Sequence, residues 1–560
     1  MIIRDSIRRS LEDGLRSLDM ADAGVPLVLE RPREAAHGDM STPVAMALAK
    51  TLRKNPLEIA ETIAAKIKLP SDIVSSVEVI KPGFINFRFA DAALRQGLLT
   101  VISSGDGYGS SGIGRGSPHL IEYVSANPTG PLVIVSARAA AVGSAIVNLL
   151  NFAGFEAKSE YYVNDYGGQV TALGESFKYR LRERFGLLKP GEEIGAYPGE
   201  YLKAMAEKTP EPLCRHMLEA RDKARDKARD EGNAVTQDAT RYAVDAILFG
   251  IDVDLEAFGI KFDNRFLESS LHPRAVRDTL EYFVGEGVTY ERDGAVYFRS
   301  TDFGDDKDRV LKKSDGNPTY FVADVAYHRN KLDRGFARAV DLLGPDHHGH
   351  VPRMKAAMSV LGAAADWLEV LIVGWVTLLE DGKPAAMSKR KGEFVTLRDL
   401  VDDVGADVAK YFFLMRRANT PLDFDLTLAR KQSDENPVYY VQYAHARISS
   451  VTRFARENGH GYDTETVDLD KLSAGSEREL MKQIVYLPLV VEGAALSMEP
   501  NRLTVYAQEL AATFHQFYHE CRIVSDDRSL TSARLLLADA TRQVLKTTLH
   551  LLGVSAPSSM

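Results

Sequence analysis

The chain has 560 residues, of which 45% are hydrophobic and 26% are charged, a composition typical of globular proteins rather than of disordered or fibrous ones. Its length corresponds to about three to four domains. The formal net charge of -9 excludes a protein coated in basic surface, so any nucleic-acid contact must use local patches.

The cellular compartment is indicated by what the chain lacks. Only two cysteines occur, which fits a reducing environment. The first residues, MIIRDSIRRSLEDGLRSL, mix charges into a helical period and have no signal-peptide cleavage pattern. No apolar run approaches the about 20 residues that cross a bilayer. We therefore expect a cytoplasmic protein that does not span a membrane.

Residues 1–112 are predicted to form a small α+β domain. Helical periodicity over 41–66 is followed by the strand-like run VEVIKPGFINFRF, which is interrupted at Pro82 and Gly83. The glycine- and serine-rich stretch 103–117 then indicates a linker, so we place a domain boundary there.

Residues 113–400 are predicted to form an α/β domain with a Rossmann-type parallel sheet. A buried strand that contains Glu122, a helix that ends at Gly154 and a second strand make a strand–helix–strand unit. Such a unit places the loop after its first strand at the carboxyl edge of the sheet, where nucleotides bind. A charged subdomain is expected to interrupt the sheet at about 185–300.

Residues 401–560 are predicted to form an α-helical bundle. Helical periodicity dominates this region, and the apolar face of its last long segment is formed by Leu537, Ala540, Val544 and Leu551.

The loop that follows the first strand of the sheet has the sequence SANPTGPL. Pro128, Thr129 and Gly130 precede a helix, so backbone N–H groups and a helix N-terminus could be presented to an anion. A tight turn that only connects two elements explains this short motif equally well.

Two carboxylates stand where a cation could be bound. Tyr320 and Asp324 are four residues apart and share one face if their segment is helical. The alternative is a surface aspartate above a core tyrosine. Glu122 lies in an otherwise apolar strand, and a buried carboxylate requires a partner, for which a guanidinium would serve.

Three histidines and one aspartate follow another apolar strand in the run LLGPDHHGH. The spacing of His347, His348 and His350 does not exclude a metal site. Histidines at a strand end can equally donate hydrogen bonds to ligand hydroxyls and phosphates, and we favour this interpretation.

A cationic loop occurs in AAMSKRKGEF. Lys389, Arg390 and Lys391 stand beside Ser388 and Gly392, an arrangement suited to holding a polyphosphate, although a basic surface loop is the simpler reading of this segment alone. Together with the SANPTGPL loop it indicates nucleotidyl transfer, in which lysine stabilises the departing pyrophosphate.

These motifs, in this order, resemble those of class I aminoacyl-tRNA synthetases and specifically of the arginyl-tRNA synthetase family, over nearly the whole chain. HGDMSTPVAMALAK and KPGFINFRF resemble its N-terminal tRNA-binding module. DENPVYYVQYAHARI and LLGVSAP resemble its anticodon-binding bundle. Its catalytic domain is resembled by EYVSANPTGPL, YYVNDYGGQ, YFVADVAYH, GPDHHGHVPR and MSKRKGEFVTL.

The resemblance implies a two-step reaction. ATP and L-arginine form arginyl-adenylate with release of pyrophosphate, and the arginyl group then passes to the 3′ end of tRNA(Arg). In this family the first step characteristically requires tRNA. Mg²⁺ is expected to arrive with ATP without a dedicated protein metal site, and a monomer is expected.

The resemblance also implies roles for individual residues. Arginine is expected to be bound by Glu122, Ser125, Asn127, Tyr320, Asp324 and His347. The expected catalytic residues are Lys389, Ser136 and His350. The expected ATP-binding residues are Pro128, Thr129, Gly130, Val133, Val135, Ser136, Gly344, Asp346, Met387, Ser388 and Lys389. The expected tRNA-binding residues are Lys50, Arg53, Tyr443, Arg447 and Arg453.

The chain departs from the family pattern at 133–136, where it reads VIVS in place of His, an apolar residue, Gly and His. Losing each histidine donor could cost about 3 kcal/mol of transition-state stabilisation. Ala386 also replaces the first lysine of the cationic loop, whereas Lys389 is retained. We favour an active synthetase in which the helix N-terminus, Ser136 and the nearby histidines compensate. The alternatives are a catalytically impaired paralogue that binds arginine or tRNA without turnover, and a ligase that acts on another acceptor.

Overall fold

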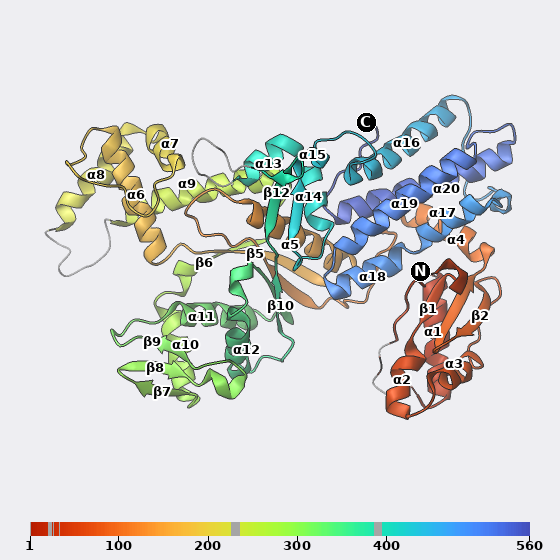
Figure 1. The fold of residues 1–560 in the computed structure, drawn as a ribbon, viewed down its shortest axis with the longest axis horizontal. Helices are drawn as coiled ribbons and strands as arrows, with labels where there is room; N and C mark the ends of the chain where they lie inside the picture. The colour runs from red at the N-terminus through yellow and green to blue at the C-terminus, as the bar shows by residue number, and fades with distance from the viewer. Residues whose placement is uncertain (1, 21–24, 26, 33, 226–235, 386–394) are drawn as a thin grey trace. The chain divides into compact units, whose positions relative to one another are not determined.

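The computed structural model describes residues 2–20, 25, 27–32, 34–225, 236–385 and 395–560. The chain divides into two compact units (Figure 1). The first unit comprises Met1–Arg115, Asn148–Gly154 and Lys431–Met560, and the second comprises Gly116–Val147 and Phe155–Arg430. The N-terminal segment and the C-terminal helices, expected as separate domains, therefore fall within one compact unit.

The N-terminal part of the first unit is an α+β module. Its antiparallel sheet has the order β1-β3-β2, and β3 buries Ile85, Phe87 and Phe89. Because side chains alternate along a strand, these three residues share the core face. The elements are α1 (Ile2–Ser17), η2 (Ala35–His37), β1 (Met40–Thr42), α2 (Val44–Leu52), α3 (Pro56–Ala64), β2 (Val74–Ile80), β3 (Phe84–Phe89), α4 (Asp91–Ser104) and η3 (Gly105–Gly107).

The C-terminal part of the first unit is a helical bundle, as predicted. Asn436 and Asp527 cap the first and last of its long helices by accepting hydrogen bonds from backbone N–H groups. The predicted apolar face of the last helix is buried. The elements are α16 (Pro437–Glu457), η7 (Leu469–Lys471), α17 (Gly475–Val485), α18 (Leu487–Ser497), α19 (Asn501–Glu520) and α20 (Arg528–Leu551).

A buried aspartate links the module to the bundle. Asp39 is 1% exposed; it accepts a hydrogen bond from the Phe89 amide at 2.9 Å and lies 3.0 Å from the Lys482 ammonium. The Tyr486 hydroxyl donates to the Asp39 carbonyl at 2.7 Å. These contacts, with the packing of α4 against α17 and α20, explain why both parts form one unit.

The second unit is built on a five-stranded parallel sheet of order β11-β10-β4-β5-β6. The chain leaves β4 in one direction and β10 in the other, so the sheet has its switch point between them, where open α/β sheets bind ligands. The predicted fold class is confirmed. The strands are β4 (Pro118–Glu122), β5 (Glu156–Val163), β6 (Asn264–Leu267), β10 (Arg338–Leu343) and β11 (Leu368–Ile372), and the helices that follow them include α5 (Ile134–Phe152), α11 (Tyr320–Asp333), η6 (Pro345–His347) and α12 (His350–Val360).

The segments between β5 and β10 form helices and a small antiparallel sheet of order β7-β8-β9. Phe283 of α10 packs edge-on against Phe298 of β8, with ring centroids 5.0 Å apart. β6 lies inside the range 185–300 expected to be inserted, yet joins the main sheet. The elements are α6 (Gly168–Arg184), α7 (Glu200–Lys208), α8 (Glu211–Arg225), α9 (Thr236–Ala257), η4 (Glu268–Leu271), α10 (Arg274–Gly285), β7 (Thr289–Arg292), β8 (Ala295–Phe298), η5 (Ser300–Phe303) and β9 (Arg309–Lys312).

The second unit ends in a small sheet and short helices. β12 pairs in parallel with β14 and antiparallel with β13. The helices after residue 400, expected to begin the C-terminal bundle, belong to this unit up to Arg430. The elements are β12 (Val376–Glu380), β13 (Lys383–Pro384), α13 (Leu397–Val404), α14 (Ala406–Leu414), β14 (Leu422–Asp425) and α15 (Leu426–Ala429).

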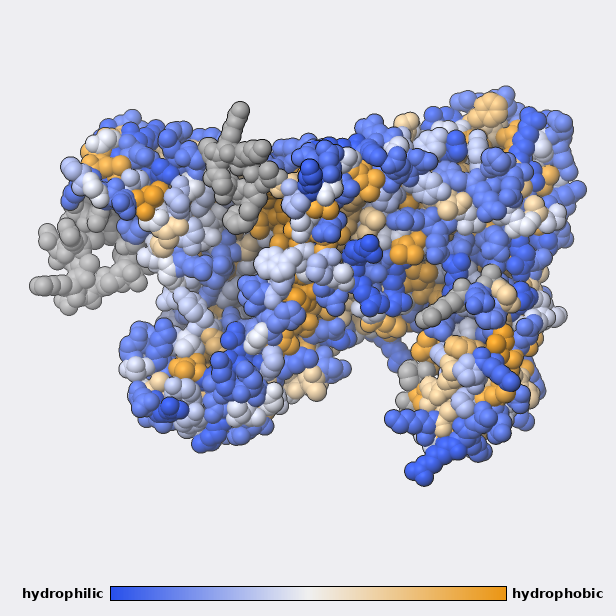
Figure 2. Space-filling view, in the orientation of Figure 1, coloured by the Kyte–Doolittle hydropathy of each residue, from blue (hydrophilic) through white to orange (hydrophobic). Residues whose placement is uncertain are grey.

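Two helical segments correct the expectation that no stretch approaches membrane-spanning length. By length and composition alone, Ile134–Phe152, with 19 residues, and Gly475–Ser497, with 23, could cross a bilayer. In each, 67% of the tested window is buried inside the fold, as in core helices of water-soluble proteins. Figure 2 shows hydrophilic side chains over most of the visible face of the bundle.

Candidate active site

The candidate site lies at the carboxyl ends of β4 and β10. β4 ends at Glu122, and the chain then turns through Val124 and Ser125, whose φ angles are 68° and 38°. This left-handed backbone is unfavourable for a β-branched residue such as valine. Ser125 stabilises the turn: its Oγ donates to Glu122 Oε1 at 2.8 Å and accepts from the Tyr162 amide at 3.1 Å.

The partner that the buried Glu122 requires is a lysine of the protein. Glu122 is 6% exposed, and its Oε2 accepts a hydrogen bond from Lys331 Nζ at 2.5 Å. The sequence suggests a guanidinium as the partner of Glu122. The fold supplies Lys331 because it stands seven residues after Asp324 on α11, and residues spaced by seven share a helix face.

Tyr320 and Asp324 lie on one helix, the condition under which their spacing places them on a shared face. α11 begins at Tyr320, whose side chain is 65% exposed, so this tyrosine is not a core residue. Asp324 is half-buried. Burial raises the pKa of Asp324 to about 6; Glu122 adds to the shift and His328 opposes it. A carboxylate in this setting favours a cationic ligand.

A third carboxylate, Glu268, was not predicted. It is 4% exposed and follows β6 directly. Burial raises the pKa of Glu268 to about 7, and the negative charge of Asp324 contributes to the shift. Its signal in the sequence was weak, because β6 is a four-residue strand, NRFL, without an apolar run.

The histidines of GPDHHGH occupy different environments. Arg353 donates to His350 Nδ1 from its Nε at 3.0 Å and from an Nη at 2.8 Å. Burial and this guanidinium lower the pKa of His350 to about 3, so the ring is neutral, with its proton on Nε2, 3.9 Å from Asp324. His347 and Asp346 are exposed, and Gly344 precedes η6. Over the described ranges, no group of three or more His, Cys, Asp and Glu side chains is placed to hold a metal.

The SANPTGPL loop is tied to neighbouring segments. Asn127 Nδ2 donates to Gln169 Oε1 at 2.8 Å, and the Thr129 amide donates to the Asn127 carbonyl at 2.7 Å. The Tyr201 hydroxyl donates to the Thr129 carbonyl. Pro128 is buried, whereas Asn127 is exposed. The Thr129 N–H therefore donates its hydrogen bond within the turn. A bound anion would have to accept hydrogen bonds from backbone amides that follow Thr129 in the chain.

The VIVS segment forms the start of α5. Val133 makes an antiparallel bridge with Thr396, and the Leu397 amide donates to the Leu132 carbonyl at 2.8 Å. α5 begins at Ile134, so the half-buried Val135 and Ser136 stand in its first turn, whose N–H groups have no acceptor within the helix. The predicted residues Met387, Ser388 and Lys389 lie outside the described residues.

Comparison with known proteins places this site in a family. Residues 113–415 match the class I (R) tRNA synthetase catalytic domain, 2–89 match the arginyl tRNA synthetase N terminal domain, and 441–560 match the DALR anticodon binding domain. The chain belongs to the arginyl-tRNA synthetase family. The resemblance drawn from the sequence motifs is confirmed.

Relatives of the arginyl-tRNA synthetase family match the chain over its whole length. The "Arginine--tRNA ligase" of Citrifermentans bemidjiense is 44% identical over 561 residues, covering 100% of this chain and 99% of that protein. The protein of the same name from Symbiobacterium thermophilum is also 44% identical, over 564 residues, with the same coverage. Thermus thermophilus arginyl-tRNA synthetase has the same fold, with a TM-score of 0.75, 21% identity and 100% coverage of both chains.

The residues that the family resemblance assigned to tRNA lie in the other compact unit. Lys50 and Arg53 are exposed at the end of α2, and Arg453 is exposed on α16. Arg447 lies over two aromatic rings, 4.9 Å from the centroid of Tyr443 and 4.7 Å from that of Tyr518. Tyr518 was not predicted; it extends the aromatic surface of α16 onto α19.

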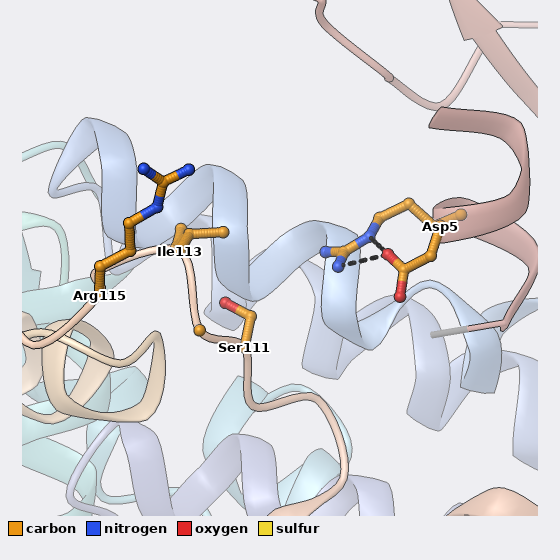
Figure 3. A pocket seen from close by; sticks show the side chains of 6 residues that line it. Asp5, Ser111, Ile113 and Arg115 are labelled. Atoms are coloured by element: carbon orange, nitrogen blue, oxygen red, sulfur yellow. Dashed lines mark hydrogen bonds and ion pairs between the residues drawn. The ribbon is translucent and has the colours of Figure 1, made fainter. Parts of the chain in front are cut away.

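A cavity of about 580 Å³ in the first unit contains none of the predicted site residues. Figure 3 shows Asp5 on one side of it and Ser111, Ile113 and Arg115 on the other. Arg4, which also lines it, already pairs with Asp5 and Glu492. This cavity is therefore not part of the candidate active site.

Proposed function

We propose that this chain is an arginine–tRNA ligase, which uses ATP to activate L-arginine and transfers the arginyl group to the 3′ end of tRNA(Arg). Membership of the arginyl-tRNA synthetase family supports the reaction. The structural observation that carries the proposal is the gathering of Asp324 and Glu268, two carboxylates of raised pKa, near the carboxyl edge of the parallel sheet. A pocket of this charge is suited to a cationic amino acid.

Asp324 and Glu268 are our candidates for binding the guanidinium. The negative charge of Asp324 helps to raise the pKa of Glu268, so a cation placed between the two carboxylates would relieve their repulsion. A planar guanidinium can donate to two acceptors at once, whereas the ammonium of lysine is a point charge, so the pair favours arginine. The exposed ring of Tyr320 adds a surface for the side chain.

The rest of the arginine site is proposed from the family resemblance. Ser125, Asn127 and His347 are proposed to complete the arginine site. Glu122, whose two oxygens accept from Ser125 and Lys331, contributes negative potential behind Asp324 rather than a free acceptor. The neutral His350 can donate from Nε2 in the same region.

Activation needs little proton transfer, because the arginine carboxylate is itself the nucleophile. Its oxygen bonds to the α-phosphorus of ATP as the bond to the pyrophosphate oxygen breaks. The free amides at the start of α5, Ser136 and Lys389 are proposed to stabilise the developing negative charge. The remaining proposed ATP contacts are Pro128, Thr129, Gly130, Val133, Val135, Gly344, Asp346, Met387 and Ser388. Mg²⁺ would be held mainly by the ATP phosphates and water.

The second substrate, tRNA(Arg), is proposed to contact the first unit. Tyr443, Arg447 and Tyr518 form a surface on which a base could stack, since base–aromatic stacking contributes about 1–3 kcal/mol per base. Lys50, Arg53 and Arg453 would contact the tRNA backbone. We propose that the enzyme works as a monomer in the cytoplasm.

The test is arginine-dependent exchange of labelled pyrophosphate into ATP, measured with and without tRNA(Arg). We expect exchange that depends on arginine and on tRNA, followed by formation of arginyl-tRNA. If no exchange occurs under any tRNA condition while arginine or tRNA still binds, the chain is instead the catalytically impaired paralogue. The VIVS segment is the reason for considering that alternative.

A further inference from the structure

A run of buried charged groups lies behind the proposed arginine site. Lys331 is 0% exposed, and its Nζ donates to Glu122 Oε2 at 2.5 Å and to Asp341 Oδ1 at 2.6 Å. Glu122 and Asp341 are directly opposite each other on β4 and β10, the two strands at the switch point of the sheet. One ammonium from α11 therefore joins the two central strands.

The run continues through His328. Its Nε2 is 2.7 Å from Asp341 Oδ2, and its Nδ1 is 2.8 Å from the carbonyl oxygen of Asp324. The nearby cation and His328 hold the pKa of Asp341 well below its usual range, so Asp341 is ionised. The His328 ring therefore lies between two hydrogen-bond acceptors, the Asp341 carboxylate and the Asp324 carbonyl.

The four side chains thus form one connected path of acidic and basic groups, in the order Glu122, Lys331, Asp341 and His328. We call this path the charge ladder. One end reaches Ser125 in the substrate loop through Glu122 Oε1, and the other end reaches the backbone of Asp324. The ladder connects the two parts of the arginine site that come from distant stretches of sequence.

Neighbouring charges do not replace Lys331. The Tyr327 ring lies under its ammonium at 4.4 Å, but an aromatic face only supplements a full countercharge. Arg334, the residue that follows α11, donates two hydrogen bonds to Glu160 on β5 and so is already paired with another carboxylate. Removing the Lys331 ammonium would therefore leave two adjacent buried carboxylates without the ammonium that they share.

We propose that Lys331 is a positioning residue for arginine: its ammonium balances Glu122 and Asp341 and thereby holds the Ser125 loop and the Asp324 carboxylate in the arrangement that binds the substrate. This inference rests on the proposed function of the same site. Lys331 itself, fully buried, touches no substrate. Its effect is expected on the KM for arginine rather than on kcat.

The test is a double-mutant cycle of Lys331→Met and Glu122→Gln. The KM for arginine of each variant is measured by steady-state pyrophosphate exchange with tRNA present. Lys331→Met removes the ammonium and keeps the side-chain length; we expect the KM for arginine to rise about tenfold, with kcat and the KM for ATP changing less than about threefold. Glu122→Gln alone leaves Lys331 with one carboxylate, and we expect a rise of similar size. Combining them removes both charges of this ion pair, so we expect the KM for arginine of the double variant to be at least about threefold lower than that of Lys331→Met, although still above the wild-type value because the negative potential of Glu122 is lost.

A packing role predicts a different pattern, because methionine fills the same space in the single and the double variant. A raised KM that the double variant does not relieve, or a KM for arginine unchanged by Lys331→Met, would overturn the inference. If Lys331→Met does not fold, Glu122→Gln against the double variant decides the question in the same way.

Lys410→Met is the matched control. Lys410 is also a buried lysine of the second unit, 4.0 Å from Asp407, but lies on α14 away from the charge ladder. We expect its loss to leave the KM for arginine within about twofold. Wild-type exchange in the same assay separates the two claims: if the wild type is inactive the proposed function fails, whereas an active wild type with an unaffected Lys331→Met enzyme refutes the ladder alone.

Discussion

The arginine side and the ATP side that we propose for the same sheet edge are built in contrasting ways. The proposed arginine side is formed by acidic and basic side chains: Asp324, Glu268 and the charge ladder of Glu122, Lys331, Asp341 and His328. The ATP side is formed by apolar side chains and backbone groups at the start of α5, with Ser136 as a polar side chain of its first turn.

The contrast follows from the charge of each substrate. A guanidinium brings one positive charge into a region of low dielectric, so the protein must supply fixed carboxylates and keep them in place. ATP brings its own charges and its metal ion, so backbone amides and a cationic loop suffice to meet it. We therefore expect catalysis to tolerate an ATP side without histidine but not an arginine side without its carboxylates.

The largest expected effect tests the arginine side. Asp324→Asn removes a charge that faces the guanidinium, and kcat/KM for arginine should fall about 10³-fold in pyrophosphate exchange. Asp333→Asn, at the exposed end of the same helix, is the control and should have no effect. A fall of less than tenfold for Asp324→Asn would remove this residue from the guanidinium site.

The next effect tests the ATP side. Lys389→Ala removes the cation that we expect beside the departing pyrophosphate, and kcat for exchange should fall about 10²-fold with the KM for arginine little changed. Lys383→Ala, exposed on β13, serves as the comparison. Robust exchange by the Lys389→Ala enzyme would show that another group carries this charge.

A pH profile should distinguish the two sides without mutation. The pKa of Asp324 is about 6 and that of Glu268 about 7, so both carboxyls gain protons as the pH falls from 8 to 5. Neutral carboxyls bind a cation weakly, so the KM for arginine should be about tenfold or more higher at pH 5 than at pH 8.

The same protons affect stability. A carboxyl whose pKa is higher in the folded than in the unfolded chain binds more protons when folded, so ligand-free stability falls as pH rises through about 4 to 7. Arginine should therefore raise the Tm more at pH 8 than at pH 5. A pH-independent shift in Tm would contradict this assignment, and Asp324→Asn should flatten the profile.

The smallest effect concerns the replaced signature. Ser136→Ala removes one neutral hydroxyl from the first turn of α5, and the exchange rate should fall only about fivefold, the value of a single hydrogen bond. Because backbone amides remain, ATP should still bind. A loss of 10²-fold or more would mean that Ser136 alone replaces the histidines, and the contrast between the two sides would weaken.

Most of the architecture was predictable because strong local patterns coincide with it. The predicted apolar residues are buried in three such elements: the strand before SANPTGPL, α5 and α20. β6 was not predicted as part of the sheet, because a strand of four residues with two polar members lacks a periodic signal. Its place at the sheet edge is decided by tertiary pairing with β5.

The site was predictable where one element carries the pattern. The spacing of Tyr320 and Asp324 indicated a shared helix face, and the same rule applied to Asp324, His328 and Lys331 would have revealed the ladder on α11. Asp341 in the apolar strand AVDLL carries the signal that Glu122 carries, a lone carboxylate in a buried strand. Glu122 and Asp341 share one lysine because the register of β4 and β10 places them opposite each other. This register could not be predicted from the sequence.

The pairing of Val133 with Thr396 bears on how the histidine-containing signature at 133–136 can be replaced. The bridge is made by backbone atoms, so the main chain at 133 is fixed whatever side chain it bears. An imidazole could be reintroduced there by Val133→His without a change in the path of the main chain. An ATP site with histidine at this position and one without it can therefore share the same backbone.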